Sequence, residues 1–227
     1  MQKGGLSLAR PAALLFDLDG TLVDSAPDLA AAGNEMRTTR GLAALPLAHF
    51  RPMVGTGARG MLGRALGIGP DDPSFIALRD EFLDRYERRM TQETRVFAGM
   101  PAVLEHLRTA LIPWGIVTNK ATRFARPLVD SLAGLSGFAT LVCGDTTAHA
   151  KPHPQPLLEA ARCLGIAARA CVYIGDDARD VQAGKAAGMM TIVAAWGYLG
   201  VGEPIEAWQA DAIVQSPAEL LTLLRTP

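Results

Sequence analysis

The sequence has 227 residues, with 22 Lys and Arg against 23 Asp and Glu and a formal net charge of −1 at pH 7. This balance gives no indication of a nucleic-acid partner or of an anionic membrane surface, and no apolar run approaches the roughly 18 residues that a membrane span needs. The hydrophobic content of 49% is typical of a globular protein with a buried core, and the length favours one large domain or a core with a smaller insert.

The N-terminus and the cysteines favour a reducing compartment. Residues 1–10 are expected to form a loose extension, and not a cleaved signal peptide, because the apolar stretch that follows them runs directly into Asp17. The three cysteines are odd in number and lack C-x-x-C spacing, so they predict neither a disulfide framework nor a zinc site. We therefore expect a cytoplasmic protein.

Short aliphatic runs alternate with helical patterns along most of the chain. The expected strands are Ala12–Phe16, Gly115–Thr118, Thr140–Cys143, Ala170–Ile174 and Thr191–Ala194, with a short sixth candidate at Asp211–Val214. The expected helices are Pro101–Ala110, Thr122–Leu132, Pro154–Leu164, Ala178–Ala187 and Pro217–Leu224. Unbroken apolar strands that alternate with helices predict an α/β fold with a Rossmann-like parallel sheet covered on both faces.

The alternation is interrupted between the first and second expected strands. Residues 25–91 contain helical patterns and no convincing strand, and Phe75–Met90 carries a clear apolar stripe at helical spacing. We therefore expect an all-helical cap domain at 25–91, inserted into a core domain made of 1–24 and 92–227. Within the insert, residues 55–60 match G-x-G-x-x-G, but a helical pattern precedes them instead of a strand, so we expect a cap loop or a substrate-facing turn instead of a dinucleotide site.

Polar residues follow four of the expected strands. These segments are D-L-D-G-T (17–21), T-N-K (118–120), A-K-P (150–152) and G-D-D (175–177). Ligands of open α/β sheets bind outside the carboxyl ends of the strands, so these segments are expected to meet. Carboxylates with one hydroxyl and one lysine suit a divalent metal ion plus a phosphate group.

The residue types at these positions predict phosphoryl transfer. Asp17 and Asp176 would bind Mg²⁺, which prefers oxygen ligands and offsets the repulsion between carboxylates and phosphate. Asp17 would then attack phosphorus and form an aspartyl-phosphate. Asp19 would protonate the leaving alkoxide and later deprotonate the water, and Lys151 and Thr118 would bind the phosphoryl oxygens.

Each feature alone has an ordinary structural explanation. A D-x-D at a strand end can be a capped loop, Thr118 a turn or helix-cap residue, Lys151 a surface lysine, and the G-D-D segment a helix N-cap. The occurrence of all four at the ends of separate strands favours a catalytic site.

With these motifs the chain resembles phosphatases of the haloacid dehalogenase superfamily that carry a helical cap. The matching signatures are D-L-D-G-T (17–21), V-T-N (117–119), Lys151 in A-K-P-H-P, and G-D-D-A-R-D (175–180). The resemblance implies the catalytic roles given above and a core sheet of five strands in the order 5-4-1-2-3.

The resemblance also implies further ligands. The backbone carbonyl of Asp19 would complete the Mg²⁺ site with Asp17 and Asp176. Asp177 and Asp180 are candidates for contacts around the metal ion or for water-mediated ligation, and Thr21 and Asn119 are expected to contact the substrate.

Within the superfamily, the whole chain is similar to phosphoglycolate phosphatases, notably at residues 22–29. Residues 57–59, 114–125 and 196–198 are closer to bacterial N-acetylmuramic acid 6-phosphate phosphatases. Either substrate has a carboxylate that could pair with Arg59 or Arg123, and both arginines could equally be solvated surface charges.

Three other activities are considered, and two of them are disfavoured by the residues. A sugar phosphomutase would use the same core residues, since the cap decides which nucleophile reaches the intermediate. A dehalogenase is disfavoured because its reaction has no leaving alkoxide for Asp19 to protonate. A phospho-aspartate signalling receiver is disfavoured because Asp19 should shorten the life of the aspartyl-phosphate. The expected partner is a small phosphomonoester, with no nucleic acid or membrane, and the expected state is a monomer or weak homodimer.

Overall fold

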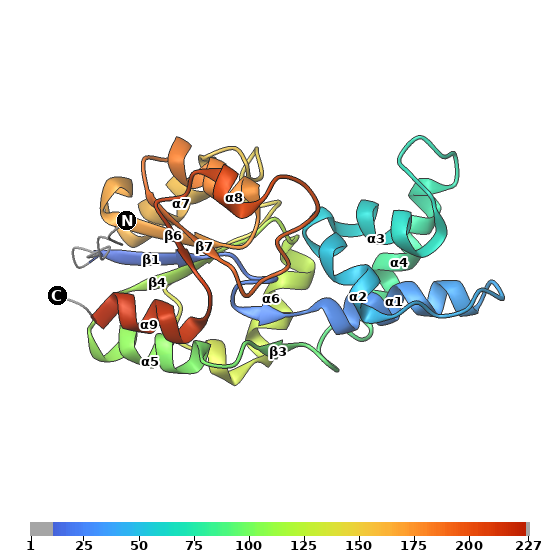
Figure 1. Ribbon diagram of the computed structural model, residues 1–227, viewed down its shortest axis with the longest axis horizontal. Helices are drawn as coiled ribbons and strands as arrows, with labels where there is room; N and C mark the ends of the chain where they lie inside the picture. The colour runs from blue at the N-terminus through green and yellow to red at the C-terminus, as the bar shows by residue number, and fades with distance from the viewer. Residues whose placement is uncertain (1–10, 226–227) are drawn as a thin grey trace.

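The computed structural model describes residues 11–225 and confirms the α/β fold class. Figure 1 shows a parallel sheet flanked by helices, and beside it a group of helices that runs from α1 (Ala26–Thr38) to α4 (Phe75–Glu87). The expected N-terminal extension, residues 1–10, lies outside the described residues.

The main sheet has six strands in the order β5-β4-β1-β6-β7-β8, and all neighbouring pairs are parallel. The strands are β1 (Ala13–Phe16), β4 (Trp114–Val117), β5 (Thr140–Val142), β6 (Cys171–Gly175), β7 (Met190–Ala194) and β8 (Ala212–Val214). The five main strands expected from the sequence lie in the expected order. The expectation of a five-stranded sheet was wrong, because the short candidate strand β8 pairs with β7 and extends the sheet at that edge.

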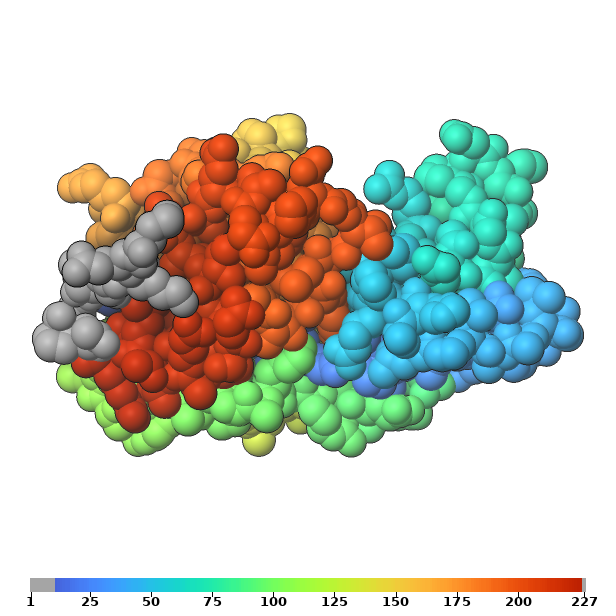
Figure 2. Space-filling view, viewed as in Figure 1, coloured from blue at the N-terminus to red at the C-terminus, as the bar shows by residue number. Residues whose placement is uncertain are grey.

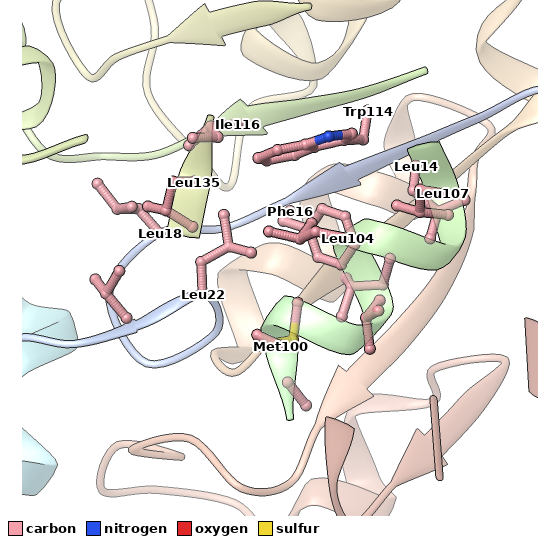
Figure 3. Close-up of a cluster of buried hydrophobic side chains, with 14 of the residues drawn as sticks. Leu14, Phe16, Leu18, Leu22, Met100, Leu104, Leu107, Trp114, Ile116 and Leu135 are labelled. Atoms are coloured by element: carbon pink, nitrogen blue, oxygen red, sulfur yellow. The ribbon is translucent and has the colours of Figure 1, made fainter. Parts of the chain in front are cut away.

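Strand β1 lies in the middle of the sheet and is fully buried on both faces. Leu14 and Phe16 point to one face, where they pack with Trp114 against helix α5 (Figure 3). Leu15 points to the opposite face. The first face is covered by α5 (Met100–Thr109), α6 (Thr122–Ser131) and α9 (Pro217–Arg225), and the second by α7 (Gln155–Leu164) and α8 (Ala178–Ala186). The aspartates that follow β1 are thus carried by a fully buried strand in the middle of the sheet.

The helical insert has its own hydrophobic cluster, which includes Met36, Phe50, Met61 and Phe82. Its other elements are α2 (Leu47–Phe50), the 3₁₀ helix η1 (Arg51–Thr56) and α3 (Gly57–Leu66). Figure 2 shows the insert as a separate lobe with an indentation between it and the core. We refer to residues 26–87 as the cap; the domain boundaries at 24/25 and 91/92 stay a prediction.

A two-stranded antiparallel pair, which the sequence did not predict, joins the two connections between core and cap. Strand β2 (Val23–Asp24) pairs with β3 (Arg95–Val96). Next to this pair, the fully buried carboxylate of Asp28 accepts hydrogen bonds from the backbone N–H groups of Glu93 and Thr94, at 3.0 and 2.8 Å. The two connections are therefore fastened together where the cap begins.

Short 3₁₀ helices complete the core: η2 (Ala133–Leu135), η3 (Ala168–Ala170) and η4 (Ile205–Trp208). Over residues 11–225, the chain forms no helix with the length and apolar character needed to cross a membrane.

Candidate active site

A cavity of about 280 Å³ lies at the carboxyl ends of the strands, with the cap on its other side. Its lining includes the four residues expected to be catalytic, Asp17, Asp19, Thr118 and Lys151, together with the expected metal ligand Asp176. The four strand-end segments therefore meet in one place, as their positions in the sequence predict.

Lys151 lies at the centre of the charged groups. Its Nζ is 2.9 Å from Oδ1 of Asp17 and 2.7 Å from Oδ1 of Asp180, and it also donates to the hydroxyl of Tyr173 at 2.8 Å and to the carbonyl of Val117 at 3.0 Å. Burial alone would lower the pKa of Lys151, but the two carboxylates outweigh it and the net shift is upward. The ammonium is thus fixed in its charged form next to the predicted nucleophile.

Asp176 is held from two sides by groups of the core. Its Oδ1 accepts a hydrogen bond from the Thr21 hydroxyl at 3.0 Å, and its Oδ2 accepts one from the backbone N–H of Tyr198 at 2.8 Å. Thr21, expected to contact substrate, is fully buried and its hydroxyl is directed to Asp176. Gly20 allows this close packing: it has φ +91°, and a Cβ at that position would lie 2.1 Å from Oδ2 of Asp176.

Three carboxylates form the one candidate metal cluster within residues 11–225. One oxygen each from Asp17, Asp176 and Asp180 lie within 4.8 Å of one another. Burial raises the pKa of Asp17 to about 7 although Lys151 opposes the rise, and burial followed by the charge of Asp17 raises that of Asp176 well above its ordinary value. Ionising these carboxylates together is therefore unfavourable in the protein alone, even with Lys151 beside them. Oxygen ligands with uncompensated charge fit a hard divalent cation.

The carboxylate of Asp19 points away from this cluster and has separate partners. Its Oδ1 accepts a hydrogen bond from the Ser25 hydroxyl, and its Oδ2 is 3.1 Å from Nζ of Lys120. The same Nζ lies 3.0 Å from the hydroxyl of Tyr86, which comes from cap helix α4. Lys120 and Tyr86 both line the cavity. Lys120 was placed by the sequence in the T-N-K segment without being given a role, and Tyr86 was missed. For Lys120 the available signal was its position directly after the V-T-N motif.

In the segment after β4, Thr118 and Asn119 have different roles. The hydroxyl oxygen of Thr118 accepts from the backbone N–H of Lys120 at 3.1 Å, which leaves its hydrogen available to a phosphoryl oxygen. The side-chain amide of Asn119 bonds both backbone groups of Lys151, each at 2.9 Å. Asn119 lines the cavity, but its polar atoms bind the backbone of Lys151 and so hold that residue in place.

Asp177 and Asp180 have different surroundings. Asp177 caps helix α8 and forms an ion pair with Arg179, whose Nε lies 2.8 Å from its Oδ1. Arg179 also donates to the carbonyl of Gly55 in the cap. Asp180 belongs to the carboxylate cluster itself, and its Oδ2 accepts from the backbone N–H of Asp177 at 3.1 Å. The G-D-D-A-R-D segment therefore fixes the cluster on one side and contacts the cap on the other.

The two arginines expected to contact the substrate lie elsewhere. Arg59 is exposed and does not line the cavity. Arg123 is half exposed, also lies outside the lining, and pairs with Glu87 at 3.0 Å and Asp84 at 3.7 Å. The sequence identified residues of suitable charge, but it did not show which face of α3 or α6 would carry them.

The cap side of the cavity is almost entirely apolar. Among the described cap residues that line it, Tyr86 carries the one polar side chain; the aliphatic and aromatic members are Leu29, Val54, Ala58, Phe82 and Leu83. Gly55 and Gly57 of the G-x-G-x-x-G segment also line it, but the expectation of a loop or turn was wrong, because the segment forms the end of η1 and the start of α3.

The chain is similar in sequence to named proteins over nearly its whole length. The family model for haloacid dehalogenase-like hydrolases matches residues 14–194. A phosphoglycolate phosphatase of Xanthomonas campestris pv. campestris is 47% identical over 211 residues, which cover 92% of this chain and 95% of that protein. An N-acetylmuramic acid 6-phosphate phosphatase of Pseudomonas aeruginosa is 41% identical, with coverage of 93% and 94%.

The fold is shared with solved structures as well. A predicted phosphoglycolate phosphatase from Haemophilus somnus 129PT superposes with a TM-score of 0.84 at 24% identity, covering 96% of this chain and all of that one. CbbY from Rhodobacter sphaeroides, solved with xylulose-(1,5)bisphosphate, gives a TM-score of 0.74 at 24% identity, with coverage of 94% and 99%. With its sheet order, its strand-end motifs and these relatives, the chain belongs to the haloacid dehalogenase-like hydrolase family, as a phosphatase.

Proposed function

We propose that this enzyme is a Mg²⁺-dependent phosphoglycolate phosphatase that acts through an aspartyl-phosphate on Asp17. The proposal depends on one observation: Asp17 and Asp19 line the same cavity but have different partners. Asp17 contacts Lys151 at 2.9 Å and belongs to the carboxylate cluster, whereas Asp19 contacts Lys120 at 3.1 Å outside it. Two carboxylates in different surroundings suit two different roles.

Asp17 serves as the nucleophile. Its Oδ1 accepts from the backbone N–H of Leu18 at 2.8 Å and from Lys151, and no hydrogen bond from the described residues occupies Oδ2. Oδ2 attacks phosphorus while the ester P–O bond breaks, so the phosphoryl group moves from the substrate alkoxide to the carboxylate. Water then attacks the same phosphorus, breaks its bond to Oδ2 and releases inorganic phosphate.

Asp19 moves the proton in both half-reactions. It protonates the departing alkoxide and then takes a proton from the attacking water. Thr118 and Lys151 bind the phosphoryl oxygens, on which charge develops during each transfer. Both are buried and hydrogen-bonded to neighbouring groups, which reduces the reorganisation needed during the reaction.

Asp17, Asp176 and the backbone carbonyl of Asp19 would hold Mg²⁺, with Asp180 as a neighbouring carboxylate. When bound, the ion neutralises the carboxylates and polarises the phosphoryl group. The fit is supported by the spacing of the cluster and by the unfavourable ionisation of Asp17 in the protein alone.

The choice of phosphoglycolate is supported by relatives of that name at 44% and 47% identity. The second candidate substrate, N-acetylmuramic acid 6-phosphate, is favoured by the 41% identical enzyme of Pseudomonas aeruginosa. No observation favours a phosphomutase or a signalling receiver over these phosphatases. We further propose a cytoplasmic enzyme that acts as a monomer or weak homodimer on a small phosphomonoester, without a nucleic-acid or membrane partner.

A phosphate-release screen tests the proposal. Purified enzyme with Mg²⁺ is given 2-phosphoglycolate, N-acetylmuramic acid 6-phosphate, hexose phosphates and nucleotides, each with and without EDTA. The highest kcat/KM is expected for 2-phosphoglycolate, and chelation should abolish release. Preference for the muramic acid substrate would assign the second function, and undiminished release in EDTA would refute the metal-dependent mechanism.

A further inference from the structure

The ammonium of Lys120 has one N–H donor without a partner among the described residues, and it lies next to Asp19, where the leaving group of the substrate is expected. A lysine ammonium carries three N–H donors, and the partners of Lys120 are Asp19 at 3.1 Å and the Tyr86 hydroxyl at 3.0 Å. Its Nζ also lies 4.8 Å from the centre of the Tyr86 ring. The side chain is 9% exposed, so an anion that reached the third donor would meet a largely dehydrated charge.

The other two cations that line the cavity have other partners. Lys151 lies beside Asp17 with four acceptors around its Nζ, and its proposed partner in the substrate is the phosphoryl group and not the leaving portion. Arg179 is engaged by both carboxylate oxygens of Asp177 and by the carbonyl of Gly55. The cap contributes no charged side chain to the lining. Among the described lining residues, Lys120 is therefore the cation best placed to meet a negative group on the leaving portion of a substrate.

The position of Asp19 limits which negative group can reach Lys120. An acid that protonates the ester oxygen must lie within roughly 3 Å of it. Lys120 is 3.1 Å from Oδ2 of Asp19, so when this oxygen delivers the proton the ester oxygen lies at most about 6 Å from the ammonium. A carboxylate attached to the carbon that bears the ester oxygen spans this gap, and the rest of such a substrate needs no further polar partner from the apolar cap wall.

We propose that Lys120, held in place by Tyr86 of the cap, is the receptor for the substrate carboxylate and selects phosphomonoesters whose carboxylate is adjacent to the ester-bearing carbon. This inference rests on the proposed function and deepens it. In the bound state the substrate carboxylate takes the free donor of Lys120, between Asp19 and the hydroxyl of Tyr86. The specificity cation thus belongs to the core loop after β4, and the cap contributes a tyrosine that holds it.

The same geometry separates the two candidate substrates. In 2-phosphoglycolate the carboxylate and the ester oxygen share one carbon. In N-acetylmuramic acid 6-phosphate the lactyl carboxylate is carried on O3, several bonds from the ester oxygen, so the bulk of the sugar must also fit between the core and the cap before it meets Lys120. Lys120 in this position therefore favours the smaller substrate.

The test compares 2-phosphoglycolate with ethyl phosphate, which has the same ester-bearing carbon and no carboxylate. We measure the ratio of the two kcat/KM values in the wild type, in Lys120→Met and in Tyr86→Phe, with Lys185→Met as control because Lys185 is exposed on α8, outside the cavity lining. Loss of a buried charge pair predicts that Lys120→Met lowers this ratio by about 30-fold or more. Tyr86→Phe should lower it less, and Lys185→Met should leave it unchanged.

The ratio is independent of any general damage to Asp19, because both substrates release an alkoxide. An equal loss on both substrates in Lys120→Met would overturn the inference and leave the phosphatase function standing. Absence of 2-phosphoglycolate turnover in the wild type would instead refute the proposed substrate. If Lys120→Met turns over neither substrate, calorimetric binding of 2-phosphoglycolate to Asp17→Asn and to the Asp17→Asn, Lys120→Met double variant decides, and equal affinities would refute the role of Lys120.

Discussion

The metal-free enzyme is expected to lose stability as pH rises. Asp17 is the group whose contribution to this loss can be quantified, because its pKa in the folded chain is known. In the unfolded chain the carboxyl of Asp17 has its ordinary pKa of 3.8, whereas burial raises this pKa in the folded chain to about 7. Below 3.8 both states are protonated and the difference vanishes. Between the two values the folded state binds the additional proton, so the free energy of unfolding falls until pH passes about 7.

The shift from 3.8 to about 7 corresponds to at most about 4 kcal/mol. The pKa of Asp176 is raised for the same reason and moves stability in the same direction. Because Mg²⁺ requires deprotonated carboxylates, its stabilising effect should grow over the same pH range. Metal binding would thus offset the unfavourable ionisation of these buried carboxylates.

Urea unfolding of the EDTA-treated protein between about pH 5 and about pH 8 measures this effect. Asp17→Asn is the matched control, since asparagine has nearly the same shape and does not titrate. The variant should lose less stability than the wild type over this range, and excess Mg²⁺ should restore the wild type most strongly at the alkaline end. A wild-type curve that stays parallel to that of Asp17→Asn would refute the reasoning.

Three further substitutions test individual contacts. Asp17→Asn should lower kcat for phosphate release at least about a thousandfold, since it removes the nucleophile; retention of near-normal turnover would refute the aspartyl-phosphate. Gly20→Ala should cost about 2 kcal/mol of unfolding free energy and lower kcat, because φ is +91° and the new Cβ would displace Asp176. Tyr198→Phe should also cost about 2 kcal/mol in urea unfolding, since its hydroxyl accepts from the backbone N–H groups of Ser25 and Ala26, at 2.8 and 3.0 Å; unchanged stability would show that water replaces that hydroxyl.

The fold and the strand-end residues could be predicted because each depends on local sequence. The aliphatic runs predict buried parallel strands, and the polar residues directly after them must lie at the carboxyl edge of the sheet. The residues Asp17, Thr118 and Asp176 follow from this reasoning without knowledge of the cap. The two-residue strands β2 and β3 escaped notice because no periodicity can be read from two residues.

Contacts between core and cap could not be predicted in the same way. Arg59 and Arg123 have a suitable charge, but their helices place them outside the cavity. The contact of Tyr86 with Lys120 joins residues 34 positions apart and depends on how α4 packs over the core. A helical stripe reports that Tyr86 is buried, and it does not report that the hydroxyl meets an ammonium.

Polar and apolar lining residues of the cavity are divided between core and cap. All of the described charged side chains that line it come from the core, whereas the cap contributes side chains such as Leu29, Val54 and Phe82. An apolar wall excludes water and strengthens the electrostatic interactions of the charged groups opposite. Because this wall is apolar, the cap can distinguish between substrates mainly by their shape. Recognition of substrate charge must then come from the core, and Lys120 lies where the chemistry of phosphoryl transfer and the choice of leaving group meet.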